Sequence, residues 1–432
     1  MGITILAMKL IVKKSRLKGT VTIPASKSHT IRAVAIASLA DGESTIHKPL
    51  VSGDTQAVID CYRALGAEID TSDPKLWKVV GTSGEIKAPG EIIDVGNSGT
   101  TLRIAMGSAT LAQAGQVIRF TGDEQLTSRP VGPLMDSLGD LGAKCVSINN
   151  NGKAPLEVTG KLAGGKTGIA SHTSQYLSSL LLCAPLAAKD IEIEVTELNE
   201  PDYVQMTLDW LDKQGIEYEN QQFQRFKIRG GQKYKSFDAV VPADFSSATF
   251  FFCAAALVAD EVTLLGLDFS DSQPDKAVVH YLKAMGANIS IQTNSVTVKA
   301  APLKGIEIDM NKTPDALPAM AVTAAFAEGQ TRLVNVAQAR SKETDRIKCM
   351  AEELKKMAVN VEELPDGLII EGDRPIPAEL NGRSDHRIVM ALSLAGLKLN
   401  GQCTIDTAEA VSVTFPDYVE LMQSIGADME TK

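Results

Sequence analysis

A motif that joins the end of a helix to the start of a strand recurs along the whole chain. In each copy a helical segment ends at a small residue, and alternating apolar and polar positions follow. The small residues are Gly66, Gly142, Gly215, Gly286, Ala358 and Gly426, spaced 68–76 residues apart. Glycine directly after a helix supplies the left-handed residue that lets the chain turn into a strand. Because Ala358 has a Cβ atom, we expect its turn to differ from the others.

A second marker repeats with the same period. Strands are predicted after alanine-rich helices near Thr45, Val117, Ile191, Val262, Arg332 and Thr404, at spacings of 70–74 residues. Two markers with one period predict six similar units of about 72 residues, each with about two helices and several short strands. The pattern therefore indicates an α/β protein built from repeats. An ordinary doubly wound sheet is the alternative.

Composition narrows the class of protein. The chain has 432 residues, a net charge of −10, 44% apolar and 22% charged residues, which is typical of a soluble globular protein. Its longest apolar run, 250–259, is too short to span a bilayer, and Lys9 interrupts the apolar N-terminus, so we expect no signal peptide. We interpret residues 1–7 as a start-site extension before Met8.

The counts of single residue types exclude further classes. The six cysteines form no CxxC pair, which favours reduced thiols and a cytoplasmic location. The five histidines are too dispersed for a zinc site. An acidic chain with 5% aromatic residues does not predict a nucleic-acid surface, which needs basic stripes and stacking side chains.

The predicted helix starts indicate where anions could bind. Ser, Thr, Asp and Pro, the residues preferred at helix N-caps and in first turns, recur once per unit in two sets. The first set is Ser28, Ser98, Thr173, Ser246, Thr313 and Asp385, and the second is Asp54, Arg129-Pro130, Pro201-Asp202, Pro274-Asp275, Glu343 and Pro416-Asp417. Helix N-termini present free N–H groups and a partial positive charge, so starts that converge would attract anions.

Seven cations accompany these helix starts although the chain is acidic overall. They are Lys27, Arg32, Arg103, Arg129, Lys342, Arg346 and Arg387. Each one alone is more simply explained as a solvated or salt-bridged side chain, and each Ser or Asp as a cap. Together they predict a ligand with several phosphate or carboxylate groups, because arginine forks suit both anions. Asp315 and Glu343 lie among these cations and are candidates for proton transfer.

Residues 160–167 read GKLAGGKT and match the phosphate-binding P-loop pattern. A P-loop needs a helix that begins at its lysine, whereas Gly168 follows directly here and the helical pattern begins only near Thr173. A loop between two strands is therefore the favoured interpretation, and a P-loop nucleotide hydrolase is an alternative function.

The polar motifs also resemble those of one known family. PASKS…R (24–32), GNSGT…R (96–103), SRP (128–130), SQ (174–175), PDA (314–316), KETDR (342–346), DHR (385–387) and TFPDY (414–418) occur here. Their order and spacing are similar to those of the 5-enolpyruvylshikimate-3-phosphate synthases from Gly19 to Ala427. The UDP-N-acetylglucosamine enolpyruvyl transferases look less similar, because they have AKN in the first motif and lack the KETDR and DHR pair. A non-catalytic anion-binding repeat protein is a further alternative, against which the carboxylates of Asp315 and Glu343 argue.

The resemblance implies an α/β (α+β) fold in the form of a two-domain inside-out α/β barrel with six βαβαββ repeats, three per domain. One domain would comprise residues 25–242 and the other residues 1–24 plus 243–432, with hinges near 24 and 242–243. The implied reaction transfers the enolpyruvyl group of phosphoenolpyruvate to the 5-hydroxyl of shikimate 3-phosphate and releases phosphate, on the route to chorismate and the aromatic amino acids. It implies a cytoplasmic monomer that closes on its substrates, without cofactor or metal and without nucleic-acid or membrane partners.

The roles of the family's residues carry over to the matching positions. Shikimate 3-phosphate would contact Lys27, Ser28, Arg32, Thr173, Ser174, Gln175, Asp315, Gln338 and Lys342. Phosphoenolpyruvate would contact Lys27, Asn97, Gly99, Arg129, Gln175, Arg346 and Arg387. Asp315 resembles the base that takes the 5-hydroxyl proton. Glu343 and Lys27 are candidates for proton transfer at the methylene carbon, with His386 beside them.

Several positions depart from the family pattern. Thr173 and Gln338 stand where Ser and Asn are usual, and Ile104 replaces a Pro after the GNSGT turn. Val413 replaces a Lys, so we expect the phosphoenolpyruvate pocket to lack one cation and to bind glyphosate more weakly. The family's Ser-x-Pro-Tyr segment reads NEPDY at 199–203, which leaves one phosphate contact open between Asn199 and Glu200.

Overall fold

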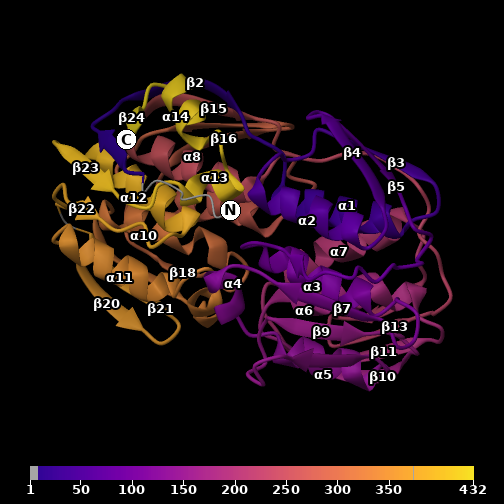
Figure 1. Ribbon diagram of the computed structural model, residues 1–432. Coiled ribbons are helices and arrows are strands. Elements are labelled where there is room, and N and C mark those ends of the chain that lie inside the picture. Colours follow the sequence, from indigo (N-terminus) through magenta and orange to yellow (C-terminus); the bar gives the residue numbers. More distant parts are fainter. Residues whose placement is uncertain (1–7, 373) are drawn as a thin grey trace. The chain divides into compact units, whose positions relative to one another are not determined.

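The computed structural model describes residues 8–372 and 374–432, so the extension predicted for residues 1–7 lies outside the described residues. The chain divides into two compact units (Figure 1). The central unit is Ala25–Val241. The terminal unit combines the N-terminal segment through Pro24 with Pro242–Lys432.

The central unit contains three four-stranded sheets. Their strand orders are β14 (Asp238–Val240), β3 (Glu43–His47), β5 (Leu76–Val80), β4 (Glu68–Asp73); β6 (Ile93–Asp94), β7 (Val117–Thr121), β9 (Leu156–Thr159), β8 (Lys144–Ser147); and β10 (Gly165–Ser171), β11 (Ile191–Leu198), β13 (Arg225–Ile228), β12 (Tyr218–Gln221). Its helices are α1 (Lys27–Leu39), α2 (Gly53–Ala64), α3 (Gly99–Ala109), α4 (Glu124–Ser128), α5 (Gly132–Asp140), α6 (Ser174–Cys183), η1 (Ala184–Leu186) and α7 (Pro201–Lys213). Pairing of β14 with β3 joins the end of this unit to its start.

The described residues of the terminal unit form three more four-stranded sheets. Their strand orders are β2 (Leu17–Thr22), β15 (Ala259–Leu265), β17 (Ser295–Lys299), β16 (Asn288–Gln292); β18 (Glu307–Asp309), β19 (Gly329–Val334), β21 (Gly367–Gly372), β20 (Asn360–Leu364); and β22 (Glu379–Leu380), β23 (Gln402–Ile405), β1 (Leu10–Lys13), β24 (Asp428–Thr431). Its helices are α8 (Phe245–Val258), η2 (Pro274–Lys276), α9 (Ala277–Ala284), η3 (Pro314–Ala316), α10 (Leu317–Ala325), η4 (Ala337–Ser341), α11 (Arg346–Lys356), α12 (His386–Lys398), α13 (Ala410–Thr414) and α14 (Tyr418–Ser424). In Figure 1 the indigo strand β1 lies beside the yellow C-terminal strands, with which it pairs.

The six sheets in the described part of the chain share one pattern of strand directions. The first two strands of each order are parallel, and the other neighbours are antiparallel. The six strands predicted from the second sequence marker are β3, β7, β11, β15, β19 and β23, and each takes the second, internal position of its sheet. The predicted α/β content is confirmed, and the alternative of one doubly wound sheet is wrong.

Three helices in each unit are buried on nearly all sides: α1, α3 and α6 in the central unit, and α8, α10 and α12 in the terminal unit. Apart from polar first turns in several of them, these helices are mostly apolar all round rather than along one stripe, as in the run FFFCAAAL at 250–257 of α8. By contrast, α7 and α11 bury one face and expose the other. No helix in the described ranges is long and apolar enough to cross a membrane.

The helix starts agree only partly with the predicted caps. Ser98, Thr173, Thr313, Asp385 and Asp417 are N-caps as predicted, and Pro201 and Pro274 begin their helices. Ser28, Ser246 and Asp54 lie in the first turns of their helices, whose caps are Ser26, Asp244 and Ser52, whereas the caps Asp345 and Val131 come after the predicted Glu343 and Arg129-Pro130. At the first four of these caps, a side-chain oxygen of the cap accepts a first-turn N–H, which fixes where the helix begins.

The turn at Ala358 does not differ from the glycine turns, so that expectation is wrong. Gly286 has φ +105°, and Ala358 also lies in the left-handed region, at φ +63°. The N–H of Val359 donates to the carbonyl of Leu354 at 3.1 Å, the same closing bond that Ala287 makes to Leu282 after Gly286. The tertiary structure therefore imposes the left-handed turn on a residue that disfavours it.

Replacing Ala358 with Gly is expected to raise the free energy of unfolding by about 0.5–1 kcal/mol, because a left-handed L-residue costs about 1–2 kcal/mol and glycine loses about half of that in chain entropy. Urea unfolding followed by circular dichroism measures the difference. Ala64→Gly, inside the last turn of α2, is the control and should lower the stability by about 0.5–1 kcal/mol. A lower free energy of unfolding in Ala358→Gly would show that the left-handed conformation of Ala358 is not strained.

The P-loop interpretation is wrong in this fold. Lys166 and Thr167 lie in strand β10, where the Nζ of Lys166 is 3.3 Å from Oε1 of Glu192 on the paired strand β11. No helix begins at the lysine, so backbone N–H groups are not gathered there for a phosphate. Residues 160–164 form the expected loop between strands β9 and β10.

Candidate active site

The start of α1 carries the first cation of the predicted site. Lys27 is the first residue of this helix, and its Nζ lies 3.0 Å from Oδ2 of Asp54, the second residue of α2. Ser28 follows and is half-buried. The ammonium group of Lys27 is thus held in place by a carboxylate of the neighbouring helix.

Arg32, one turn later in α1, is fixed within the central unit. Its side chain is buried, and its guanidinium donates hydrogen bonds of 2.9–3.3 Å to four oxygens: the hydroxyls of Thr207 and Ser178 and the carbonyls of Ser28 and Tyr203. Burial lowers the pKa of Arg32 to about 10, so the group stays charged at neutral pH. Since a guanidinium has five N–H donors, most of this group is committed to the protein itself.

The GNSGT turn gathers two arginines at the start of α3. Nη2 of Arg129 donates to Oδ1 of Asn97 at 2.6 Å, and Nη1 of Arg103 donates to Oε1 of Gln175 at 2.6 Å. A Cβ atom on Gly99 would lie 2.6 Å from Nη1 of Arg103 and 2.9 Å from Nη1 of Arg129. The missing side chain at position 99 therefore lets two guanidinium groups approach the first turn of α3, which suits an anion.

The start of α6 holds a carboxylate instead of a side-chain cap. Thr173 is the N-cap but makes no capping hydrogen bond with its own side chain. Oε2 of Glu200 accepts the backbone N–H of Ser174 at 3.2 Å, the hydroxyl of Ser174 at 2.7 Å and the hydroxyl of Thr173 at 3.4 Å. Gln175, next in the helix, donates from Nε2 to Oγ1 of Thr100 at 3.0 Å.

In the terminal unit one buried arginine binds both predicted catalytic carboxylates. Arg346 begins α11 and is 1% exposed; its nitrogens lie 2.8 Å from Oδ1 of Asp315 and 2.5 Å from Oε2 of Glu343. Its Nε donates to Oδ2 of Asp385 at 2.8 Å. Nζ of Lys342 is 3.8 Å from Oδ1 of Asp315. The residues of the KETDR and PDA motifs therefore form one ionic cluster.

The start of α12 completes this cluster. Asp385 is the N-cap of the helix, and Nδ1 of His386 lies 3.8 Å from its Oδ1. Nη2 of Arg387 lies 3.4 Å from Oδ2 of Asp315 and donates to Oγ of Ser246 at 2.8 Å. Asp315 thus faces three cations, all of them predicted from the sequence as site residues.

The loop that precedes Asp385 is anchored by α11. Arg383 and Ser384 both have positive φ angles, +57° and +53°, a conformation that costs about 1–3 kcal/mol for each such residue. Glu353 of α11, which is fully buried, accepts the N–H of Asn381 at 2.8 Å and Nη2 of Arg383 at 2.8 Å. These bonds hold the strained loop and so fix where the DHR motif begins.

The electrostatics of the cluster keep Asp315 and Asp385 ionised. Burial raises the pKa of Asp315, but Arg387, Lys342 and Arg346 together outweigh it and hold the pKa well below its usual value. Burial also raises the pKa of Asp385, and the charge of Arg346 reverses that shift. Burial lowers the pKa of Arg346, but its carboxylate partners outweigh this and raise it further above its usual value.

Sequence reasoning missed several members of these clusters as site residues. Asp54 and Ser246 entered only as helix-start candidates, and Asp385 entered as a helix-start candidate and as part of the DHR motif. Their partners are distant in the chain: Asp54 binds Lys27 across 27 positions, and Ser246 binds Arg387 across 141 positions. The sequence carries no local signal for either pairing.

Two further predicted positions lie in the terminal unit. Gln338 is 6% exposed and donates from Nε2 to the carbonyl oxygen of Asn311 at 2.9 Å. Val413 lies half-buried in α13.

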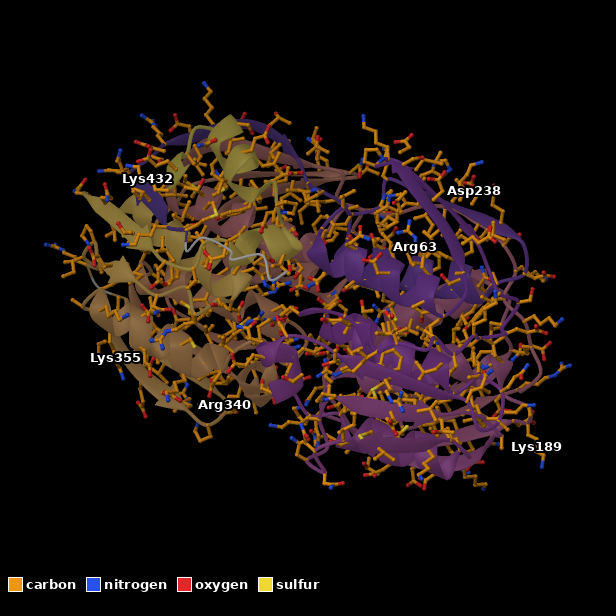
Figure 2. All side chains as sticks on the ribbon, viewed as in Figure 1. Arg63, Lys189, Asp238, Arg340, Lys355 and Lys432 are labelled. Carbon is orange, nitrogen blue, oxygen red and sulfur yellow. The ribbon has the colours of Figure 1, made fainter. Side chains whose placement is uncertain are left out.

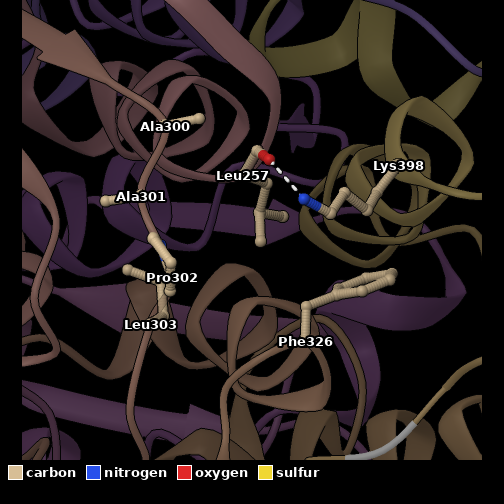
Figure 3. Close-up of a pocket in the computed structure, with 7 residues that line it drawn as sticks. All are labelled: Leu257, Ala300, Ala301, Pro302, Leu303, Phe326 and Lys398. Carbon is tan, nitrogen blue, oxygen red and sulfur yellow. Dashed lines mark hydrogen bonds between the residues drawn. The ribbon is translucent and has the colours of Figure 1, made fainter.

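A separate pocket of about 310 Å³ lies in the terminal unit (Figure 3). Leu257, Phe326, Lys398 and residues 300–303 line it, and Nζ of Lys398 donates to the carbonyl oxygen of Leu257 at 2.8 Å. This bond satisfies a carbonyl in the last turn of α8. The pocket contains none of the predicted site residues.

Comparison with known proteins gives the same family as the motifs. Residues 11–422 match the EPSP synthase (3-phosphoshikimate 1-carboxyvinyltransferase) family. The chain belongs to the EPSP synthase family. It is 52% identical over 424 residues to the 3-phosphoshikimate 1-carboxyvinyltransferase of Acetivibrio thermocellus, covering 98% of this chain and 100% of that relative. The corresponding protein of Ruminiclostridium cellulolyticum is 48% identical over 423 residues, again covering 98% and 100%.

Solved structures of EPSP synthases share the fold. That of Acinetobacter baumannii has a TM-score of 0.83 and 29% identity, covering 99% of this chain and 100% of the other. The enolpyruvyl transferase NikO of Streptomyces tendae, with a TM-score of 0.76, 19% identity and 99% coverage of both chains, supports the fold alone. The mixed α/β fold of this chain is therefore EPSP synthase-like.

Proposed function

We propose that this chain transfers the enolpyruvyl group of phosphoenolpyruvate to the 5-hydroxyl of shikimate 3-phosphate and releases inorganic phosphate. The observation that carries the proposal is the ionic cluster of the terminal unit, in which Asp315 and Glu343 lie against Arg346, and Asp315 also faces Lys342 and Arg387. Cations alone would suffice to hold an anion. Carboxylates among them add groups that can accept and donate protons.

The reaction needs two proton transfers and one displaced group. In the addition step, the methylene carbon of phosphoenolpyruvate gains a proton, and the 5-hydroxyl oxygen bonds to C2 as it loses its own proton. In the elimination step, the new methyl group loses a proton, the C2–phosphate oxygen bond breaks, and the double bond re-forms. We assign the 5-hydroxyl proton to Asp315. Glu343 and Lys27 are the candidates for the proton at the methylene carbon, and His386 lies next in the chain to the carboxylate that caps α12.

The substrates bring two phosphates and two carboxylates, which the predicted residues would divide between them. We assign shikimate 3-phosphate to Lys27, Ser28, Arg32, Thr173, Ser174, Gln175, Asp315, Gln338 and Lys342. We assign phosphoenolpyruvate to Lys27, Asn97, Gly99, Arg129, Gln175, Arg346 and Arg387. The guanidinium fork of arginine can bind two oxygens of a carboxylate or of a phosphate at once, which suits the anionic groups of both substrates.

The low pKa of Asp315 makes it a weak base in the ligand-free protein. Its basicity depends on Lys342, Arg346 and Arg387, which lower the pKa by their charge. Substrate anions that bind to these cations would offset part of this effect and raise the pKa of Asp315. Binding of both substrates would thus prepare the base for the reaction.

We further propose the inside-out α/β barrel with six βαβαββ repeats for this fold, and a monomer that acts in the cytoplasm and closes on its substrates. The common strand pattern of the six sheets in the described residues supports the repeat. The domain roles follow from the residue assignment: the central unit supplies the helix starts at 27, 99 and 174, and the terminal unit supplies the catalytic carboxylates.

The proposed reaction is tested by measuring phosphate release from phosphoenolpyruvate. We expect release only when shikimate 3-phosphate is also present, because the hydroxyl that attacks C2 belongs to that substrate. Phosphate release from ATP instead would contradict the proposal. Release from phosphoenolpyruvate with a UDP-sugar acceptor would indicate the other class of enolpyruvyl transferase.

Replacing Gly99 with Ala is expected to raise the KM for phosphoenolpyruvate by about ten- to a hundredfold, with a much smaller change in kcat. The added Cβ would push the guanidinium groups of Arg103 and Arg129 away from the start of α3, and one lost charge-assisted contact accounts for a change of this size. Gly132→Ala is the matched control, because nothing lies within 4 Å of the Cβ it would add. Unchanged KM in Gly99→Ala would contradict the assignment of this turn to phosphoenolpyruvate.

A further inference from the structure

We propose that the carboxylate of Glu200 occupies the phosphate position of the acceptor substrate in the ligand-free protein, and that binding of shikimate 3-phosphate displaces it. This inference rests on the function proposed above, which assigns Thr173, Ser174 and Gln175 to that substrate. It makes Glu200 a residue that sets the affinity and the selectivity for the acceptor.

The geometry at α6 is that of an anion site with an anion in it. One oxygen of Glu200 accepts three hydrogen bonds, from the hydroxyl of Thr173 and from the N–H and hydroxyl of Ser174. Glu200 is 1% exposed, so water does not share in binding this carboxylate. Thr173 does not cap the helix with its own side chain, and the carboxylate takes that place. Two hydroxyls and a helix N-terminus are the donors that phosphate oxygens use in proteins.

The carboxylate and a phosphate group exclude each other here. The hydroxyl and amide of Ser174 point to one acceptor position, and that position holds Oε2 of Glu200. A phosphate brought next to this carboxylate would also meet like charge in a buried setting, where repulsion is stronger than in water. Binding of the phosphate through these donors therefore requires Glu200 to leave.

The backbone turn at Glu200 is held by hydrogen bonds that do not involve its side chain. Glu200 is the N-cap of α7, at φ +57°, and its carbonyl accepts the N–H of Tyr203 at 3.1 Å. The N–H of Asn199 donates to the carbonyl of Ser171 at 3.1 Å. These bonds are made by backbone atoms alone, so they do not depend on the hydrogen bonds of the Glu200 carboxylate to Thr173 and Ser174.

Glu200 belongs to the segment in which the sequence departs from the Ser-x-Pro-Tyr pattern of the family. In this segment the carboxylate of Glu200 uses three donors of the anion site. Every acceptor substrate that binds here must displace this carboxylate, which costs binding free energy. The phosphate group of a phosphorylated substrate regains that free energy by accepting the hydrogen bonds of Thr173 and Ser174. An unphosphorylated alcohol has no such group. The carboxylate of Glu200 therefore favours phosphorylated acceptor substrates.

Glu200→Gln tests the inference, with Glu197→Gln as the matched control. Glu197 lies in the same segment but is exposed and pairs with His172 at 3.0 Å, so its replacement removes the same charge without touching α6. Calorimetric titration should show that Glu200→Gln binds shikimate 3-phosphate about ten- to a hundredfold more tightly than the wild type, the size of one charge-assisted contact. It should also bind inorganic phosphate more tightly than the wild type and Glu197→Gln, which should be equal to each other.

Equal or weaker binding of both ligands by a folded Glu200→Gln would overturn the inference and make Glu200 a permanent cap of α6. A crystal structure of the wild type with shikimate 3-phosphate supplies a second measurement that needs no variant. Oε2 of Glu200 should then lie beyond hydrogen-bond distance of the N–H of Ser174, and retention of that bond would also overturn the inference. Failure of the proposed function is separate: the wild type would release no phosphate from phosphoenolpyruvate, while the titration with inorganic phosphate would still report on Glu200.

Discussion

Arg346→Gln is expected to lower the free energy of unfolding by about 3–5 kcal/mol, the range found when one partner of a buried ion pair is removed. Arg346 is 1% exposed, and its guanidinium contacts the carboxylates of Asp315, Glu343 and Asp385. Without it, a fully buried Asp385 would lose its main counter-charge. Guanidinium chloride unfolding followed by circular dichroism measures the loss.

Arg340→Gln is the matched control. Arg340 also pairs with two carboxylates, those of Asp345 and Glu363, but its side chain is 27% exposed and lies at the surface (Figure 2). Solvent screens such pairs, so this variant should lose only about 0–1 kcal/mol. Equal losses in the two variants would show that burial does not set the strength of the Arg346 cluster.

The loss of stability caused by Arg346→Gln should become smaller as the pH falls. In the wild type the pKa of Asp315 and of Asp385 is lowered by folding, so the stability that they contribute is present above their unfolded pKa and is lost as the pH falls through the folded pKa. In the variant, burial of Asp385 without its guanidinium raises the folded pKa instead. As the pH falls, the buried carboxylates of the variant take up protons and its free energy of unfolding rises. The difference in free energy of unfolding between the variant and the wild type therefore narrows between about pH 7 and 4.

Asp315→Asn is expected to reduce kcat by about 10²–10⁴-fold, the usual contribution of a general base. Binding of shikimate 3-phosphate, measured in the absence of turnover, should stay as tight or become tighter, because one negative charge is removed beside Lys342 and Arg387. Asp309→Asn, an exposed substitution of the same kind, is the control and should leave kcat unchanged.

The acid limb of the pH profile above pH 4 is not expected to report the titration of Asp315. Since the pKa of Asp315 is held well below its usual value, the residue is ionised throughout the range above pH 4, and the acid limb of kcat/KM in this range must come from other groups. If Asp315→Asn keeps the wild-type kcat, Asp315 is not the general base. Glu343 and Lys27 are then the candidates for both proton transfers.

The repeat and the charged motifs could be predicted from the sequence because both depend on local patterns. The helix-to-strand turns recur at Gly66, Gly142 and their counterparts because a left-handed residue must follow each of these helices, and the chain provides glycine there in all copies but one. The marker strands were placed correctly because a strand with one buried face shows its alternation in any window of about five residues. The motifs around Lys27, Gly99 and Arg346 were found for the same reason: each lies in a short continuous segment.

The tertiary structure alone decided which of these groups meet. Glu200 lies at the start of α6 because α7 and α6 pack together, and no local pattern predicts that a carboxylate from position 200 caps a helix at position 174. Ala358 turns to the left because its helix and strand are held by the same packing as their glycine-bearing counterparts. The sharing of Arg346 by three carboxylates joins η3, the KETDR segment and the start of α12, across 31 and 39 positions of the chain. Local periodicity determines elements, whereas the pairing of charges across such distances follows from the packing of elements, because the burial of the apolar helices fixes where their ends lie.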